Sequence, residues 1–268
     1  SLQALMVSTA SRVGTGNIAG VSTALCLGGV GAVFWMWVIA LLGGASALVE
    51  STLAQIYKVH DGRGGSRGGP AYYIEAAVGS RGLAALFAVL LILTYMVGFN
   101  LVASFNLVDS FAGYGFFDSR TPLIAGAALA LVTAICIFGG GKRLTAITSV
   151  LVPVMGGAYV LMALAMIVLH LELVPGVLAA IFENAFDFQA IFGGFTGSAM
   201  MYGIKRGLFS NEAGVGSAPN AAAAANVSHP VKQGLAQVLS VFIDTLLICS
   251  ATAFLCLCSG VEPDAALK

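Results

Sequence analysis

The chain has 268 residues, of which 59% are hydrophobic and only 9% are charged, and its formal net charge at pH 7 is zero. Soluble globular domains carry about 25% charged residues, so this composition excludes a soluble protein and predicts a polytopic membrane protein surrounded by the lipid bilayer. A neutral chain offers no basic surface to a polyanion, and we therefore expect no nucleic-acid partner.

The first predicted span covers residues 2–27 and is interrupted at Gly14–Gly16. Each glycine inside a helix costs about 1 kcal/mol relative to alanine. Unpaired backbone groups are costly in hydrocarbon, so an interrupted helix is tolerated only where protein or a polar cavity covers it. The pattern favours either a binding site, to which Thr15 and Asn17 bring polar side chains, or close packing of small residues against a neighbouring helix.

Four more spans are predicted before residue 170, since a spanning helix needs about 20 mostly apolar residues. A glycine-rich polar loop at residues 58–70 separates the first two of them. We also expect a loop at residues 139–143 and an acidic surface helix at residues 172–189. The four spans cover residues 32–57, 83–111, 123–138 and 146–169.

The sixth predicted span, residues 190–216, contains seven glycines. We expect its helix to be interrupted beside Gly207, with Gly193–Gly197 and Gly203 as alternatives. Interrupted spans in corresponding positions of two halves indicate an inverted-repeat transporter, in which the first span corresponds to the sixth.

The seventh predicted span, residues 234–257, holds Asp244 next to Thr245. An acidic residue inside the membrane is costly and indicates a functional role. Asp244 could bind a cation, or it could hydrogen-bond to the interrupted sixth span.

Other charged residues inside the predicted spans also need partners. Arg12 and Glu50 lie in the first two spans, which a tight turn joins, and we predict that they form an ion pair. The alternative is that Arg12 extends to the cytoplasmic surface and Glu50 bonds elsewhere. We expect Glu212 to pair with Arg206 or Lys205 rather than to act as a ligand.

Loop charges predict the orientation of the chain, because cytoplasmic loops of membrane proteins are enriched in Lys and Arg. We place the N-terminal end of the first span in the cytoplasm, in a multi-pass protein of the plasma (inner) membrane. In this topology only Arg120 and Lys268 are basic residues on the outer side. The cytoplasmic basic residues are Lys58, Arg63, Arg67, Arg81, Lys142, Arg143 and Lys232, and the outer acidic residues are Asp118, Glu172, Glu183, Asp187, Glu262 and Asp264.

No motif in the sequence supports catalysis. It has no phosphate-binding loop, no metal-ligand spacing and no nucleophile–base pair. All five cysteines lie in apolar segments, which favours small core residues over a disulfide framework. We therefore expect no enzyme activity and no organic cofactor.

Several motifs resemble those of a transporter family. They include Gly14–Val21 (GTGNIAGV), Phe34–Trp37 (FWMW), Gly68–Ile74 (GGPAYYI), Arg206–Gly214 (RGLFSNEAG) and Phe242–Thr245 (FIDT). No single motif is decisive, but they follow the family's order over nearly the whole chain. Together they resemble the alanine/glycine:cation symporter family, whose members are often called sodium:alanine symporters.

The resemblance implies an all-α polytopic membrane protein with a leucine-transporter-like inverted-repeat fold. The chain would hold the first five-helix repeat plus two helices of the second, and we expect it to be a fragment. The implied function is sodium-coupled symport of a small neutral amino acid, alanine or glycine, into the cell by alternating access. The alternatives are a membrane-embedded structural or channel subunit, or an inactive truncated transporter.

The resemblance also implies two sets of site residues at the interrupted spans. Asn17 would contribute to both sets, although a helix–helix hydrogen bond would also explain it. Phe209 could close over the substrate, or it could be an ordinary core aromatic. Substrate would bind at Gly14, Thr15, Gly16, Asn17, Phe209, Ser210 and Asn211, and sodium, the coupling ion, at Val13, Asn17, Asp244 and Thr245.

Overall fold

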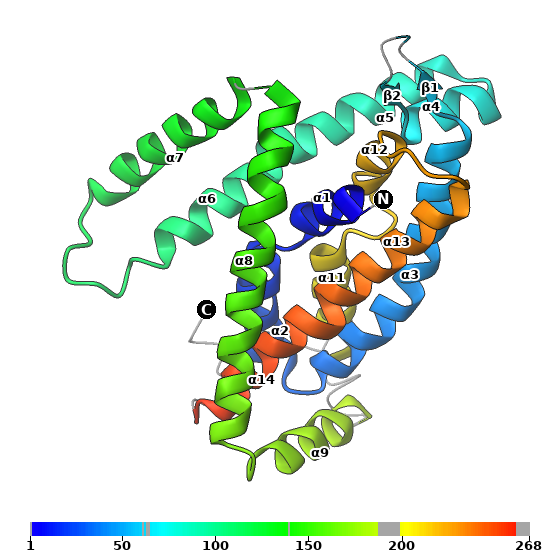
Figure 1. Ribbon diagram of the computed structural model, residues 1–268. Coiled ribbons are helices and arrows are strands. Elements are labelled where there is room, and N and C mark those ends of the chain that lie inside the picture. The colour runs from blue at the N-terminus through cyan, green and yellow to red at the C-terminus, as the bar shows by residue number, and fades with distance from the viewer. Residues whose placement is uncertain (1, 61, 63–64, 139, 187–198, 261–268) are drawn as a thin grey trace.

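The computed structural model describes residues 2–60, 62, 65–138, 140–186 and 199–260. Helices make up most of this part of the chain, and its β-structure is a single small hairpin (Figure 1). In the hairpin, β1 (Val59–His60) pairs antiparallel with β2 (Ser66–Arg67). The expected helical architecture therefore holds, apart from this hairpin in the glycine-rich loop.

The first predicted span consists of three helical pieces. They are α1 (Leu2–Arg12), a π-helical turn η1 (Gly16–Gly20) and α2 (Val21–Gly28). Between α1 and η1 the chain bends at residues 13–14. The bend thus includes one of the glycines at which the sequence suggests an interruption.

The next helix begins after a sharp reversal. Gly29 has a φ of 76°, which glycine adopts without the steric penalty of a side chain, and α3 (Ala32–Ile56) follows. After the hairpin, α4 (Pro70–Tyr73) starts with a proline in its first turn and continues into the π-helical turn η2 (Ile74–Val78).

Three further segments form one continuous helix: α5 (Arg81–Leu93), the π-helical turn η3 (Thr94–Phe99) and α6 (Asn100–Asp109). A turn-rich connection of residues 110–120 then leads into α7 (Thr121–Phe138). Figure 1 shows α6 and α7 as a hairpin of helices that extends to one side of the molecule.

The following helix, α8 (Gly140–Leu169), begins earlier than the sequence suggests. The loop expected at residues 139–143 is therefore wrong over its described part. Gly140 has a φ of 76°, so the chain reverses at this residue and helix follows at once. After α8, α9 (Val174–Ala185) occupies the segment expected to form a surface helix.

The sixth predicted span contains α11 (Ala199–Asn211), and α12 (Ala218–Ala223) follows it, while its residues 190–198 lie outside the described residues. The described interruption lies after α11, at residues 212–217, where Glu212, Gly214 and Gly216 all have positive φ. The expected interruptions beside Gly207 and at Gly203 are therefore wrong. The remaining alternative, Gly193–Gly197, lies outside the described residues.

Close packing explains why those two glycines lie inside a regular helix. A Cβ atom on Gly203 would overlap the carbonyl oxygen of Ala32 and lie 2.6 Å from the Cβ of Trp35. A Cβ atom on Gly207 would overlap the side chain of Ile39. Small residues four apart let two helix backbones approach closely, and here they seat α11 against α3.

The last long helix is continuous from Pro230 to Cys258. It consists of α13 (Pro230–Phe242), the π-helical turn η4 (Ile243–Cys249) and α14 (Ser250–Cys258). Single π-helical turns inside α-helices are rare and occur frequently at functional sites. This one carries Asp244 and Thr245, both fully buried.

The protein core lies between α2, α3, α11 and the α13–α14 helix, and Figure 1 shows α13 running beside α3. In the most apolar stretch of the helix Pro230–Cys258, half of the residues are buried. In the most apolar stretch of Thr121–Phe138, none of the described residues is buried. The helix Pro230–Cys258 therefore packs inside the molecule, whereas α7 keeps its apolar side chains outward.

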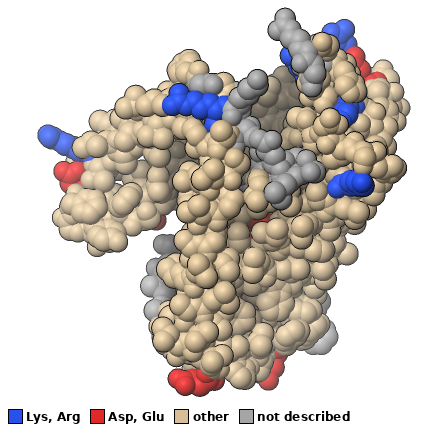
Figure 2. Space-filling view, viewed as in Figure 1, with Lys and Arg blue, Asp and Glu red and all other residues tan. Residues whose placement is uncertain are grey.

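Five helices in the described part of the chain are long and apolar enough to cross a membrane. In the face shown in Figure 2, the Lys and Arg atoms lie in the upper part together with some Asp and Glu atoms, whereas the charged atoms at the lower end are Asp and Glu. Much of the surface between them carries no charged side chains, as a lipid-facing surface requires. The five helices are Ala32–Ile56, Arg81–Asp109, Thr121–Phe138, Ala146–Leu169 and Pro230–Cys258.

Candidate functional site

The interruption of the first span contacts the π-helical turn of the last helix through Asn17 and Asp244. The Asn17 amide Nδ2 donates to Asp244 Oδ1 at 2.7 Å, and Asn17 Oδ1 accepts from the backbone N–H of Gly14 at 2.8 Å. Both side chains are fully buried. One amide therefore closes the bend and also ties it to a residue 227 positions away in the sequence.

Two hydroxyl groups complete the surroundings of the Asp244 carboxylate. Ser210, near the end of α11, donates to Asp244 Oδ2 at 2.8 Å, and Thr245 donates to the same oxygen at 3.1 Å. The side chains that donate to Asp244 among the described residues are all neutral. The carboxylate therefore has no cationic hydrogen-bond partner in this cluster of Asn17, Ser210, Asp244 and Thr245, which we call the Asp244 cluster.

Such a cluster suits a small hard cation, because these ions prefer carboxylate, carbonyl and hydroxyl oxygens. Hydroxyl groups can rotate so that their lone pairs, instead of their protons, point at a cation. Among the described residues, no group of three or more His, Cys, Asp or Glu side chains could hold a metal ion. A single carboxylate among neutral oxygens balances one positive charge, which favours a monovalent ion over a divalent one.

The structure adds contacts to this cluster that the sequence did not reveal. Thr252 donates to the Asn17 backbone carbonyl at 2.7 Å and contacts the Tyr159 hydroxyl at 2.7 Å. The sulfur of Cys249 lies 3.2 Å from the hydroxyl oxygen of Ser210. Sequence spacing does not indicate Thr252, because the π-helical turn η4, which contains Thr245, shifts the helical period before Thr252.

A cavity of about 240 Å³ lies at the same interruption. Gly14, Thr15 and Gly16 line it from the first span, and Phe209 and Glu212 line it from the end of α11. The backbone N–H of Gly14 already donates to Asn17 and is therefore not available to a ligand. The Thr15 hydroxyl has no hydrogen bond to any of the described residues and stays available.

Stacked aromatic rings form one wall of this cavity. Phe209 stacks on Phe99 with ring centroids 5.2 Å apart, and Phe99 stacks on Tyr95 at 4.7 Å. Gly16 faces Phe209, and a Cβ atom at Gly16 would lie 3.3 Å from its ring. The cavity therefore has an apolar wall opposite the polar backbone of the interruption.

Two predicted site residues lie away from both features. Val13 is half-buried and lines a separate apolar cavity of about 430 Å³ between α1, α8 and η4. Asn211 is fully buried at the end of α11, where its Oδ1 accepts from the Ala213 backbone N–H at 3.0 Å. The structure thus brings Gly14, Thr15, Gly16 and Phe209 to the cavity, and Asn17, Ser210, Asp244 and Thr245 to the cluster.

The predicted ion pair between Arg12 and Glu50 is wrong, because each side chain has other partners. The Arg12 guanidinium donates to the backbone carbonyl of Asn211 at 2.7 Å and to the side-chain oxygen of Gln237 at 2.8 Å. Terminal helix carbonyls lack partners within the helix and carry partial negative charge. The end of α11 therefore supplies the acceptor that we expected from Glu50.

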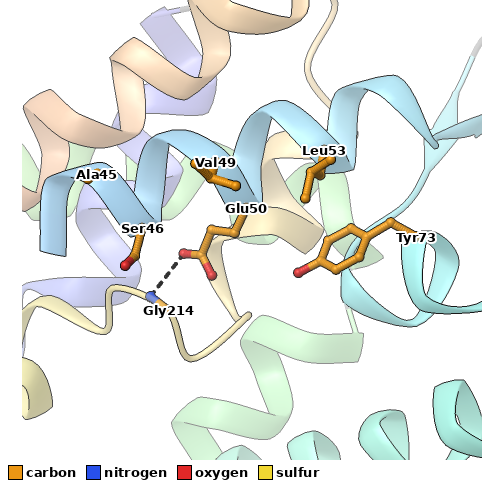
Figure 3. Close-up of a pocket in the computed structure, with 7 residues that line it drawn as sticks. All are labelled: Ala45, Ser46, Val49, Glu50, Leu53, Tyr73 and Gly214. Carbon is orange, nitrogen blue, oxygen red and sulfur yellow. Dashed lines mark hydrogen bonds between the residues drawn. The ribbon is translucent and has the colours of Figure 1, made fainter. Parts of the chain in front are cut away.

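Glu50 instead faces a cavity of about 460 Å³ between α3 and the loop after α11 (Figure 3). Its carboxylate accepts a hydrogen bond from the backbone N–H of Gly214 at 3.3 Å. Tyr73 of α4 lines the same cavity, and burial raises the pKa of its phenol to about 12, so the phenol stays neutral at physiological pH. Glu50 therefore holds the loop of the second interruption in place.

Comparison with known proteins gives a consistent result over the whole chain. The model of the "Sodium:alanine symporter family" matches residues 1–268. The amino-acid carrier protein AlsT of Bacillus subtilis is 50% identical over 263 residues, which are 98% of this chain and 56% of that protein.

Two other relatives have substrates in their names. The probable sodium/glutamine symporter GlnT of Bacillus subtilis is 51% identical over 257 residues, covering 96% of this chain and 53% of that protein. The sodium/alanine symporter AgcS of Methanococcus maripaludis is 40% identical over 265 residues, covering 97% and 58% respectively. The chain thus spans about half the length of the curated relatives that it matches.

Proposed function

Because the chain belongs to the sodium:alanine symporter family, we propose that it forms the sodium and amino-acid sites of a secondary transporter. This transporter carries a small neutral amino acid, alanine or glycine, into the cell together with sodium by alternating access. The main support for the proposal is that a candidate cation site and a candidate amino-acid site lie next to each other at one helix interruption. The Asp244 cluster and the 240 Å³ cavity share the segment Gly14–Asn17.

In this proposal sodium binds at the Asp244 cluster and the amino acid occupies the cavity. Drug-sized ligands fill pockets of about 300–1,000 Å³, so a cavity of about 240 Å³ suits a smaller molecule. The amino-acid carboxylate lies toward Thr15 and Gly16, and the side chain lies toward Phe209. Sodium then holds Asn17, and with it the bend, in the conformation that binds the amino acid.

The proposal includes a leucine-transporter-like inverted-repeat fold in the plasma membrane. The two interruptions, at Val13–Gly14 and at residues 212–217, supply the bends about which such a fold would open and close. The basic upper end of the molecule in Figure 2 lies in the cytoplasm, as the excess of Lys and Arg on cytoplasmic loops requires.

Uptake into proteoliposomes tests this function. A chimeric carrier, in which the chain replaces the matching 263 residues of Bacillus subtilis AlsT, supplies a protein of full family length. We expect an inward sodium gradient to drive accumulation of radiolabelled alanine, and an equal potassium gradient to drive none. A channel would instead equilibrate alanine without accumulation, and a structural subunit would show no uptake, so either result would refute symport.

Asn17→Ala is expected to raise the sodium concentration that gives half-maximal alanine uptake by about tenfold. The substitution removes a buried amide that bonds both Gly14 and Asp244, and bonds to charged groups contribute about 1.5–3 kcal/mol. Sodium titration of the chimeric carrier measures the shift. An unchanged sodium dependence would exclude Asn17 from the cation site.

Gly16→Ala is expected to weaken alanine binding by about tenfold while sodium still binds. The new methyl group would lie 3.3 Å from the Phe209 ring, and overpacking typically costs about 1–3 kcal/mol. Equilibrium binding of radiolabelled alanine measures the loss. Gly98→Ala serves as the control, because a Cβ atom there meets no atom of the described residues within 4 Å. Equal affinities in the Gly16 and Gly98 variants would refute the placement of the amino acid.

A further inference from the structure

Among the described residues, Glu212 is the one acidic residue in the wall of the 240 Å³ cavity. It directly follows α11, and its backbone φ is 51°, in the left-handed region that residues other than glycine rarely adopt. Strained backbone of this kind persists only where the surrounding structure holds it, and it gathers at ligand sites. The surrounding structure therefore holds Glu212 in place, and the residue is only 3% exposed.

The hydrogen bonds of this carboxylate leave one oxygen available. The Tyr95 hydroxyl donates to Glu212 Oε2 at 2.8 Å, and the Ser217 hydroxyl donates to the same oxygen at 2.7 Å. Among the described residues no hydrogen bond reaches Oε1. The expected pairing with Arg206 or Lys205 is wrong, since the two bonded partners are neutral hydroxyls that orient the carboxylate without cancelling its charge.

Among the described residues, Arg12 is the other charged side chain of the cavity wall, and its guanidinium Nη2 is buried without a hydrogen-bond partner, whereas its other two nitrogens have partners. The Arg12 guanidinium donates to the Asn211 carbonyl and to Gln237. No hydrogen bond among the described residues joins Arg12 to Glu212, so the free oxygen of Glu212 can accept from a cationic ligand, within a wall that also contains the Thr15 hydroxyl and the Phe209 ring. A zwitterionic amino acid carries one ammonium group and one carboxylate, and these neighbours provide an acceptor for the first and a donor for the second.

We propose that Glu212 binds the α-ammonium group of the transported amino acid and so restricts the substrate to molecules with a free amine. The inference rests on the proposed function and names a specificity-determining residue within it. The ammonium donates to the Glu212 carboxylate, while Tyr95 and Ser217 hold that carboxylate in place. Lactate, which has a hydroxyl group where alanine has the ammonium, is a poor ligand for the same reason.

Competition binding to the 268-residue chain in lipid nanodiscs with sodium chloride tests the proposal. Glu212→Gln keeps the size of the side chain and an oxygen that accepts from Tyr95 and Ser217, but it removes the charge. Because hydrogen bonds to charged groups contribute about 1.5–3 kcal/mol, we expect alanine to bind about 10-fold to 100-fold more weakly. The affinity for lactate should stay within about twofold, so the preference for alanine over lactate collapses.

Tyr95→Phe is the matched variant, because it removes one hydrogen bond to Glu212 but leaves the carboxylate. We expect it to weaken alanine binding by less than the glutamine substitution and to retain the preference over lactate. A merely structural Glu212 would weaken both ligands together in the glutamine variant, and this result would overturn the proposal. The proposal would also be overturned if the glutamine variant bound alanine with the same affinity as the unchanged chain.

The experiment separates this inference from the proposed function. Thermal stabilisation by sodium in the glutamine variant shows that the chain is folded and that the Asp244 cluster is intact. If the unchanged chain binds sodium but no alanine, the proposed amino-acid site is refuted and the inference fails with it. If the unchanged chain binds both, and Glu212→Gln alters neither affinity, only the role of Glu212 is refuted.

Discussion

Asp244→Asn is expected to weaken sodium binding by about 100-fold while the chain stays folded. Among the described residues, the fully buried carboxylate receives hydrogen bonds from three neutral side chains and from no cationic one, so a bound cation would supply a counter-charge in direct contact with it. Loss of about 2.7 kcal/mol, within the range for bonds to charged groups, corresponds to this factor. Without sodium, the variant should be at least as stable as the unchanged chain, because it no longer buries a charge.

Thermal unfolding in sodium chloride and in potassium chloride measures both effects. The unchanged chain should be stabilised by sodium alone, because a ligand that binds only the folded state raises its stability. Asp109→Asn, at the exposed end of α6, is the matched control and should keep this response. A full sodium response in Asp244→Asn would remove the carboxylate from the cation site.

Gly203→Ala is expected to destabilise the folded chain by about 1–3 kcal/mol, the usual cost of overpacking. The added methyl group would overlap the carbonyl oxygen of Ala32, and backbone atoms of α3 cannot move aside as a flexible side chain could. This overlap can be removed only if α11 moves away from α3. Because Ser210 lies on α11, this movement would also weaken its bond to Asp244.

A lower melting temperature of purified protein in nanodiscs checks the prediction. Gly126→Ala in α7 is the control, because in the described part of the chain a Cβ atom there meets no atom within 4 Å. Alanine is the better helix former, so this control should be neutral or stabilising by up to about 1 kcal/mol. Equal melting temperatures for the two variants would show that the α3–α11 contact tolerates a larger residue.

Hydropathy identified long helices well, because a run of about 20 apolar residues has few alternatives to a helix in a membrane. The predicted spans 32–57 and 123–138 agree closely with the helices Ala32–Ile56 and Thr121–Phe138. The local backbone geometry was harder to predict from the sequence. A reversal at Gly140 and a continuous helix after it look the same in sequence as a glycine-rich loop.

Glycine counts could not distinguish interruption from close packing. At Gly14 the neighbouring polar residues also indicated an interruption, and in the structure the Asn17 side chain accepts a hydrogen bond from the backbone of the bend. At Gly203 and Gly207 the reason for glycine is the neighbouring α3, which is distant in sequence. The bend after α11 begins instead at Glu212, a residue whose positive φ no propensity would suggest.

Local sequence patterns could not predict which residues come together to form the site. Asn17 and Asp244 each stood out as polar residues in apolar segments, but nothing local predicts a bond between residues 227 positions apart. The family resemblance suggested that pairing of segments, whereas it gave no role to Tyr95, Thr252 or Glu212. Those roles depend on side-chain geometry that only the folded chain reveals.

The most direct test of the account is the linkage between sodium and alanine binding to the 268-residue chain. Because both ligands act on the bend at Gly14–Asn17, each should raise the affinity of the chain for the other by the same factor, about 5-fold to 150-fold. Alanine binding measured across a series of sodium concentrations at constant ionic strength, and sodium binding measured with and without alanine, give the two factors. Equal alanine affinities in sodium and in potassium would contradict the account.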